Sequence, residues 1–283
     1  MGMWIALVVF YGLAKGVRDG LKKKALEKSG VMEVLFLHTA LSFVFTLPFS
    51  HGVFDMPFEF YILIFVKSFV IFLAWIFSFY SIKRMPVSLY GVLDSTRMVF
   101  STVLALLFLG EVMTLPKFTG LLLVLTGVIV VNLGKDGDEK IKIGYLLMAI
   151  ASCLLNAVSG FMDKKLLADG SLTVSQMQFW YMFYLTLLYG GYMVATKTPI
   201  KLQTVKSNYW ILILSVLFVA ADRALFIANT DPESQVTVMT LIKQSSVIIT
   251  VLSGWLIFKE KHILKRSICA VVVVSGILIA TLL

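Results

Sequence analysis

Two long stretches of this chain repeat one another at a constant offset of 149 residues. Residues 107–131 align with residues 256–280, so that Glu111 falls on Glu260. The same offset pairs Tyr61 with Trp210, Val87 with Val236 and Ser88 with Thr237. Many secondary transporters consist of two such apolar repeats that rock about a site between them. The duplication therefore makes a membrane transporter the first hypothesis.

The composition is that of an integral membrane protein. Hydrophobic residues make up 59% of it and charged residues 14%, which is not the make-up of a surface that faces water. Apolar runs of about 20 residues, the length that crosses a bilayer core, predict ten spans with short connections. The six prolines fall at the edges of these runs, so we expect the spans to be unkinked. The predicted limits are 3–20, 31–49, 59–81, 86–109, 116–134, 143–162, 174–195, 209–229, 235–258 and 265–283.

A polar linker at residues 135–142 divides the chain into two halves of five spans each, residues 1–134 and residues 143–283. Because five is odd, the second half enters the membrane from the opposite side, and the two repeats are inverted. The first two spans of each half align at an offset near 141, which pairs Lys23 with Lys164. The predicted fold is therefore an all-α integral membrane protein of ten transmembrane helices, arranged as two inverted five-helix repeats.

In each half, one span ends in the pair Gly110-Glu111 or Lys259-Glu260, and a short polar turn leads into a final span with small residues. In these features, present in two copies, the chain resembles the EamA family of the drug/metabolite transporter superfamily. The resemblance implies two inverted bundles, a central substrate cavity and alternating access. The membrane-embedded glutamate of small multidrug resistance proteins has no counterpart in the first span. We expect both glutamates to be structural, each capping the helix that follows it.

Six ionisable residues fall at membrane depth within the predicted spans. A charge at the centre of a helix that faces lipid costs roughly 2.5 kcal/mol or more, so these side chains are expected to face the interior of the bundle. A rise of about 1.5 Å per residue puts all of them in the middle of the bilayer. They are Lys67, Asp94, Arg97, Asp222, Arg223 and Lys243. The repeat places Asp94 and Lys243 at equivalent positions, so opposite charges are related by the pseudo-two-fold axis.

The spacing of these charges predicts some of their partners. Asp94 and Arg97 lie three residues apart on one helical face and can pair, whereas Asp222 and Arg223 are adjacent and should have separate partners. Four positive charges against two negative leave an excess that favours an anionic or carboxylate-bearing substrate. Asp94 and Asp222 would be counter-ions or proton carriers. The predicted substrate-binding residues are Lys67, Arg97, Arg223, Lys243 and Gln244.

Other residues are weaker candidates. Trp75, Tyr90 and Trp180 are predicted cavity aromatics, although such residues more often pack against helices or lipid. Small residues in the fifth and tenth spans, such as Gly127, indicate close helix packing within the monomer or across a homodimer. Cys153 is expected to be a buried hydrophobic residue, and no spacing of cysteine and histidine indicates a metal or another cofactor.

The loop charges bear on orientation. We call the side that carries both termini face A and the other side face B. Loops on face B carry sixteen lysines and arginines against three on face A, so the positive-inside rule places face B in the cytoplasm. The family resemblance implies the opposite, and we follow the charge count because it is read from this chain. Anionic lipid headgroups explain the basic rim without a nucleic-acid partner.

These observations predict a secondary transporter in a bacterial-type plasma membrane. It would move a small polar, anionic or carboxylate-bearing metabolite by alternating access, with a proton or sodium as the coupling ion if transport is coupled. The alternative is an exporter of cationic or amphipathic compounds that uses Asp94 and Asp222. A membrane-embedded enzyme or sensor is disfavoured because no nucleophile–base pair and no soluble domain is visible.

Overall fold

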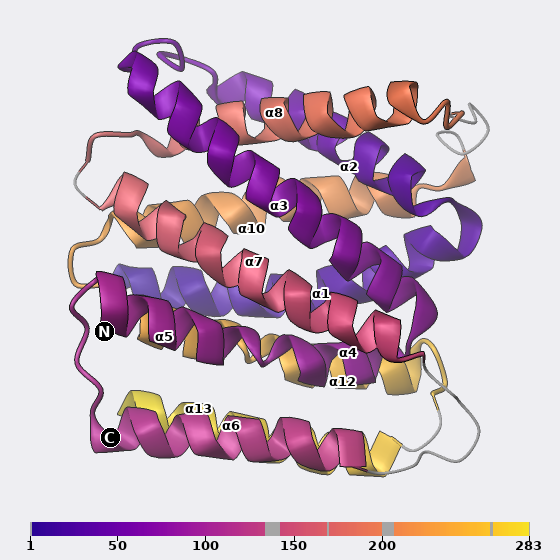
Figure 1. The fold of residues 1–283 in the computed structure, drawn as a ribbon, viewed down its shortest axis with the longest axis vertical. Coiled ribbons are helices and arrows are strands. Elements are labelled where there is room, and N and C mark those ends of the chain that lie inside the picture. Colours follow the sequence, from indigo (N-terminus) through magenta and orange to yellow (C-terminus); the bar gives the residue numbers. More distant parts are fainter. Residues whose placement is uncertain (1, 134–141, 169, 200–206, 261–262, 283) are drawn as a thin grey trace.

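A computed structural model describes residues 2–133, 142–168, 170–199, 207–260 and 263–282, and every regular element in these ranges is a helix (Figure 1). Most of the predicted linker 135–142 lies outside the described residues. In chain order the helices are α1 (Met3–Lys28), α2 (Val31–Thr46), the 3₁₀ helix η1 (Leu47–Phe49), α3 (Phe58–Arg84), α4 (Val87–Asp94), α5 (Arg97–Phe108), α6 (Leu115–Leu133), α7 (Ile143–Leu167), α8 (Val174–Ala195), α10 (Trp210–Thr230), α11 (Val236–Lys243), α12 (Ser246–Leu256) and α13 (Ile263–Leu282).

Six helical segments among the described residues are long and apolar enough to cross a membrane. The helix α1 is not among them, because three charges lie within its first 18 residues, and α8 is less apolar because it holds two glutamines and four tyrosines. The helices α6 and α13 contribute shorter apolar stretches. The six segments are Val31–Phe49, Phe58–Arg84, Val87–Phe108, Ile143–Leu167, Trp210–Thr230 and Val236–Leu256. The described part of the chain is built as a multi-pass membrane protein.

Helix boundaries follow the prolines, and the largest difference from the predicted limits is at the end of α1. Pro57 and Pro86 immediately precede α3 and α4, and Pro116 lies in the first turn of α6, where a missing N–H costs no helical hydrogen bond. The helix α1 continues to Lys28 instead of ending at residue 20. The extension brings Lys22, predicted to lie in a loop on face B, into the protein interior.

Two predicted spans are interrupted at equivalent positions of the repeat. The span 86–109 consists of α4 and α5, which meet at Ser95 and Thr96, and the span 235–258 consists of α11 and α12, which meet at Gln244 and Ser245. At both breaks backbone N–H groups donate to carbonyls three residues back, as in a 3₁₀ turn. Neither break contains proline or glycine. The expectation of unkinked spans is therefore wrong for these two.

Helices that the repeat makes equivalent pack against equivalent partners. The helix α1 packs against α10 and α12, and α7 packs in the same way against α3 and α5. The helices α6 and α13 lie side by side at one edge of the molecule (Figure 1). Both ends of the chain lie on one side of the bundle, which is face A (Figure 1).

Glycines allow two of these contacts to be very close. A Cβ atom at Gly127 of α6 would lie 2.9 Å from a methyl group of Val273 on α13. A Cβ atom at Gly16 of α1 would lie 2.5 Å from Ile249 and 2.7 Å from the carbonyl oxygen of Ser246 on α12. The small residues of α6 and α13 are thus used for packing within the chain. The close approach of α1 to α12 brings the charges of α1 next to the broken helices.

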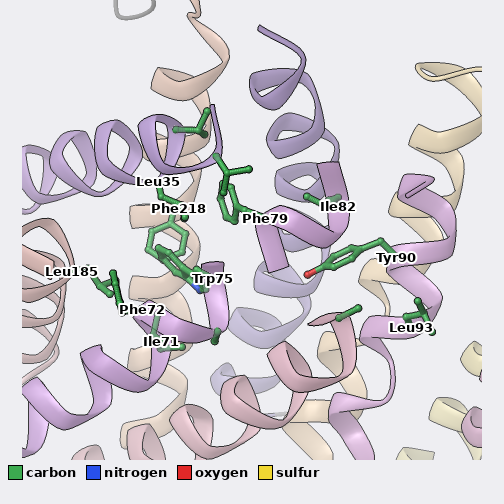
Figure 2. Packing of buried hydrophobic residues seen from close by; sticks show 14 of the residues in the cluster. Leu35, Ile71, Phe72, Trp75, Phe79, Ile82, Tyr90, Leu93, Leu185 and Phe218 are labelled. Atoms are coloured by element: carbon green, nitrogen blue, oxygen red, sulfur yellow. The ribbon is translucent and has the colours of Figure 1, made fainter. Parts of the chain in front are cut away.

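The apolar core lies between α2, α3, α8 and α10. In Figure 2, Trp75 and Phe79 of α3 lie close to Phe218 of α10 and Leu35 of α2. The ring centroids of Trp75 and Phe218 are 5.0 Å apart in an edge-on arrangement. Because three of these aromatic residues also line a charged cavity, the core forms one wall of that cavity.

Candidate functional site

A cavity in the middle of the bundle is lined by ionisable and aromatic side chains from both halves of the chain. Its volume is about 80 Å³ for the centres of water-sized groups. At roughly 10–15 Å³ for each water, that volume holds about half a dozen water molecules or one small polar ligand. The lysine, arginine, histidine and aspartate residues that line the cavity are Lys15, Arg18, Lys22, His38, Lys67, Arg97, Asp163, Asp222 and Lys243.

The helix α1 contributes a row of charges that sequence reasoning overlooked. Lys15, Arg18, Asp19 and Lys22 follow the spacing of one helical face, and the first three are each at most 5% exposed. Lys22 Nζ lies 2.9 Å from Asp19 Oδ1. This spacing within an apolar run was the signal that could have identified these residues. The other overlooked residue, Asp163, lies one position beyond the predicted limit of its span.

Asp94 is shared between two cations. Arg97 Nη2 lies 3.2 Å from Asp94 Oδ1, which confirms the pairing predicted from their spacing. The Lys15 ammonium pairs with the other oxygen of the same carboxylate and donates a hydrogen bond of 3.2 Å to the Ser246 hydroxyl. One carboxylate with two cations leaves this group with a net positive charge.

The remaining carboxylates of the cavity each hold one cation. Arg18 Nη1 donates to Asp222 Oδ1 at 3.0 Å, so Asp222 and Arg223 do have separate partners, as predicted. Lys67, which is 1% exposed, lies 2.9 Å from Asp163. Its ammonium also lies 3.5 Å from the centroid of the Tyr181 ring, where a cation is attracted by the ring face. These two pairs are electrically neutral.

Lys243 differs from every other cation in the cavity. Among the residues that the structure describes, no carboxylate lies within 4.0 Å of its ammonium, and its nearest aromatic neighbour is Tyr11, with the ring centroid at 5.9 Å. The cavity and its direct ion-pair partners hold six cations and four carboxylates, so two positive charges are left over. The sequence also predicted an excess of two positive charges, although it did so from a different set of residues.

Several predicted site residues lie elsewhere. Arg223 points to α8, where it bonds Gln178 and Ser175 at 3.4 Å, and it does not line the cavity. Gln244 is 1% exposed, does not line the cavity, and its amide has no hydrogen-bond partner among the described residues. Trp75 does line the cavity.

The other two predicted aromatic residues are engaged in packing. Tyr90 is buried with its hydroxyl 2.6 Å from Ser78, and Figure 2 places it on α4, apart from Trp75. Trp180 donates to the carbonyl oxygen of Val53 at 2.8 Å. Neither lines the cavity.

Two glutamates join the halves at opposite ends of the bundle. The Glu111 carboxylate accepts hydrogen bonds from the backbone N–H groups of Val236 at 2.7 Å and Thr237 at 3.3 Å, at the start of α11. Glu260 accepts from the N–H groups of Val87 at 2.5 Å and Ser88 at 3.2 Å, at the start of α4, and also from the Ser88 hydroxyl. Both glutamates are helix caps, as predicted. The prediction that each caps the helix that follows it is wrong, because each caps a helix of the other half.

The residue before each glutamate turns the chain toward that cap. Gly110 and Lys259, which the repeat makes equivalent, have φ angles of +66° and +49°. Both values lie in the left-handed region, which glycine adopts freely and other residues seldom do. The loosely matched pairs Gly110-Glu111 and Lys259-Glu260 therefore share a backbone conformation.

Two lysines cap the preceding helix ends. Lys23 donates to the carbonyl oxygens of Ile82 at 3.0 Å and Met85 at 2.6 Å, at the end of α3. Lys164 donates to the carbonyl oxygen of Asp231 at 2.8 Å and to the Ser234 hydroxyl at 2.7 Å, after the end of α10. The capping lysines are related by the offset of 141 and their acceptor residues by the offset of 149. The offset of 141 and the offset of 149 therefore belong to one alignment of the first half of the chain with the second.

A bundle of apolar helices around a buried, charged cavity defines a multi-pass membrane protein with a polar interior. The described residues contain no cluster of metal-binding side chains. Residues 2–133 match the EamA-like transporter family, and this part of the chain belongs to that family, within the drug/metabolite transporter superfamily. Membership implies a membrane transporter, with a small-molecule substrate and a lipid environment, in a family of transporters and not of enzymes.

Comparison with solved structures extends the likeness of fold to the whole chain. One crystal structure, described only as that of a protein, matches over 99% of this chain and 95% of its own, with a TM-score of 0.66 and 13% identity. At that identity the match shows a shared fold alone. A search of curated proteins finds no matching sequence.

Proposed function

We propose that this chain is a secondary transporter that moves a small anionic or carboxylate-bearing metabolite across a bacterial-type plasma membrane by alternating access. It would do so as two inverted five-helix repeats, residues 1–134 and 143–283. The exchange of helix contacts under the repeat, with α1 against α10 and α12 and α7 against α3 and α5, supports this arrangement. The reciprocal caps of Glu111 and Glu260 support it too.

The observation that carries the choice of substrate is Lys243. Its ammonium belongs to a cavity lined by both halves and has no carboxylate partner among the described residues. An uncompensated charge inside a membrane protein is costly, so a site that retains one is expected to receive an opposite charge from its ligand. The shared carboxylate of Asp94 leaves Arg97 only partly neutralised and adds to the attraction.

The paired residues would act as counter-ions. Lys67 pairs with Asp163 and Arg18 pairs with Asp222, and we expect these pairs to exchange partners when the cavity changes its shape. A coupling proton or sodium ion would be handled at these carboxylates. Because the small residues of α6 and α13 pack within the chain, they give no argument for a homodimer.

The alternative of a cation exporter has less support. It requires Asp94 and Asp222 to bind the substrate, and each of these carboxylates already holds at least one cation of the protein. A cationic ligand would add to an existing positive excess.

The test is transport by the purified protein in proteoliposomes. We expect Lys243→Ala to abolish uptake of labelled anions and to leave folding unchanged, whereas Lys165→Ala, at an exposed lysine, should leave uptake unchanged. Unlabelled anions should compete and organic cations should not. Full uptake by Lys243→Ala, or competition by organic cations alone, would contradict the proposal.

A further inference from the structure

The two halves differ in charge at one set of equivalent positions. The correspondence fixed by the capping lysines relates Lys15 of α1 to Asn156 of α7. It also relates Asp94 to Lys243, and Arg97 to Ser246, both at the offset of 149. Each of these residues except Asp94 and Ser246 lines the cavity, and those two are bonded directly to Lys15.

In one set, a cation meets an anion. Lys15 extends from α1 to the junction of the broken helices, where it bonds Asp94 and the Ser246 hydroxyl. In the equivalent set, Asn156 takes the place of Lys15, Lys243 takes the place of Asp94, and Arg97 takes the place of Ser246. A neutral amide therefore takes the place of a lysine, and two cations take the places of an aspartate and a serine.

The Asn156 amide is held in place by its own helix. Its Nδ2 donates to the carbonyl oxygen of Ser152 at 2.8 Å and lies 3.3 Å from the Ser152 hydroxyl. The side chain thus has a defined position and brings no charge to it. A carboxylate at the same position would complete an internal ion pair with Lys243, in the way that Lys15 completes one with Asp94.

We propose that the negatively charged group of the substrate binds beside Asn156, between Lys243 and Arg97, and supplies the partner that the second half of the chain lacks. The inference rests on the proposed transport function and names the anion position within it. The ligand chemistry is an oxyanion, a carboxylate or a phosphate, with up to two negative charges to match the excess of two cations. Asn156 is then a specificity-determining residue, because its neutrality keeps Lys243 available.

Other positions in the cavity fit an anion less well. Lys67, Arg18 and Lys22 each have a carboxylate within 3.0 Å, so a ligand there would have to displace a protein group. Displacement leaves a buried carboxylate without its cation, which is strongly unfavourable. An anion between Lys243 and Arg97 does not have to displace a protein carboxylate from Lys243.

The first experiment compares Asn156→Asp with Lys165→Ala, which lowers the net charge by the same one unit at an exposed residue that does not line the cavity. The melting temperature of each purified protein is measured with increasing inorganic phosphate and, separately, succinate. A ligand that binds the folded state raises the melting temperature, so the wild type and Lys165→Ala should respond. In Asn156→Asp the apparent affinity should fall at least about tenfold, which corresponds to about 1.4 kcal/mol. An unchanged response in Asn156→Asp would overturn the inference, and the stronger of the two responses identifies phosphate or carboxylate.

The second experiment needs no ligand and separates this inference from the transport proposal. A double-mutant cycle combines Asn156→Asp with Lys243→Gln. If the two positions are adjacent, Lys243→Gln should lower the melting temperature more in the Asn156→Asp protein than in the wild type. Equal effects in both backgrounds would overturn the placement of Asn156 opposite Lys243. If the two substitutions are coupled but neither phosphate nor succinate raises the melting temperature, the result would support the placement of Asn156 opposite Lys243. The same result would count against anion transport.

Discussion

At the level of single residues, the cavity shows which ion pairs a sequence can reveal. Asp94 and Arg97 were predictable partners because three residues on one helix fix their separation. The pairing of Lys15 with Asp94 was not, because 79 residues separate them and their contact depends on how α1 packs. The same holds for Lys67 and Asp163. Membrane depth identified many of the charges, whereas helix packing decides which of them meet.

The pair of Lys67 and Asp163 gives a prediction about stability. Asp163→Asn should lower the free energy of unfolding by about 3–5 kcal/mol, because it leaves the buried Lys67 ammonium without a carboxylate. Denaturation of the purified protein in detergent measures the loss.

The matched control is Glu27→Gln, which breaks the exposed pair of Lys24 and Glu27. Its effect should stay below about 1 kcal/mol. Adding Lys67→Met to Asp163→Asn should recover most of the lost stability. No recovery would mean that the aspartate matters for a reason other than neutralising the lysine.

At the level of helices, apolar runs and prolines predicted where most helices lie, because a bilayer requires continuous helical hydrogen bonding. They did not predict the breaks at Ser95 and Gln244, where neither proline nor glycine signals an interruption. The breaks place Asp94 and Lys243 at helix ends beside α1, and the glycines of α1 make that approach close enough for Lys15 to bridge.

The close contact of α1 with α12 can be tested with one methyl group. Gly16→Ala should destabilise the protein by about 1–3 kcal/mol, because the added Cβ atom would lie 2.5 Å from Ile249. Gly20→Ala is the control on the same helix, since its Cβ atom would lie 3.5 Å from Ser253 in ordinary contact. Thermal melting of both variants gives the comparison, and equal melting temperatures would show that α1 can move away from α12 at little cost.

At the level of the whole molecule, the halves are tied together at both ends by the same device. Glu111 reaches the start of α11 near face A and Glu260 reaches the start of α4 near face B. The glutamates were predictable as caps, but their targets lie 125 and 173 residues away and could not be read from the local sequence. Under alternating access, each cap should close the cavity toward its own face.

Accessibility of the cavity to a membrane-impermeant thiol reagent can measure this role. The reporter is Ser159→Cys, at a residue that lines the cavity, in a protein without its native cysteines. Glu111→Ala should speed labelling from face A, and Glu260→Ala from face B, because each change removes one contact between the halves. The readout does not require a known substrate.

The controls for this experiment are exposed glutamates near the same two ends. Glu233→Ala serves for face A and Glu27→Ala for face B, and neither should alter labelling. Faster labelling from both faces in a single glutamate variant would indicate general loosening of the bundle and contradict separate closure at the two faces.

The left-handed residue before each glutamate makes the two closures unequal in energy. Gly110 adopts its φ of +66° without steric cost, while Lys259 adopts +49° against a penalty of roughly 1–2 kcal/mol. If opening relaxes this backbone, the chain has a built-in preference to open toward face B, by about fivefold or more at equilibrium. This preference would determine the face toward which the protein is open when no substrate is bound. Lys259→Gly should reduce the preference.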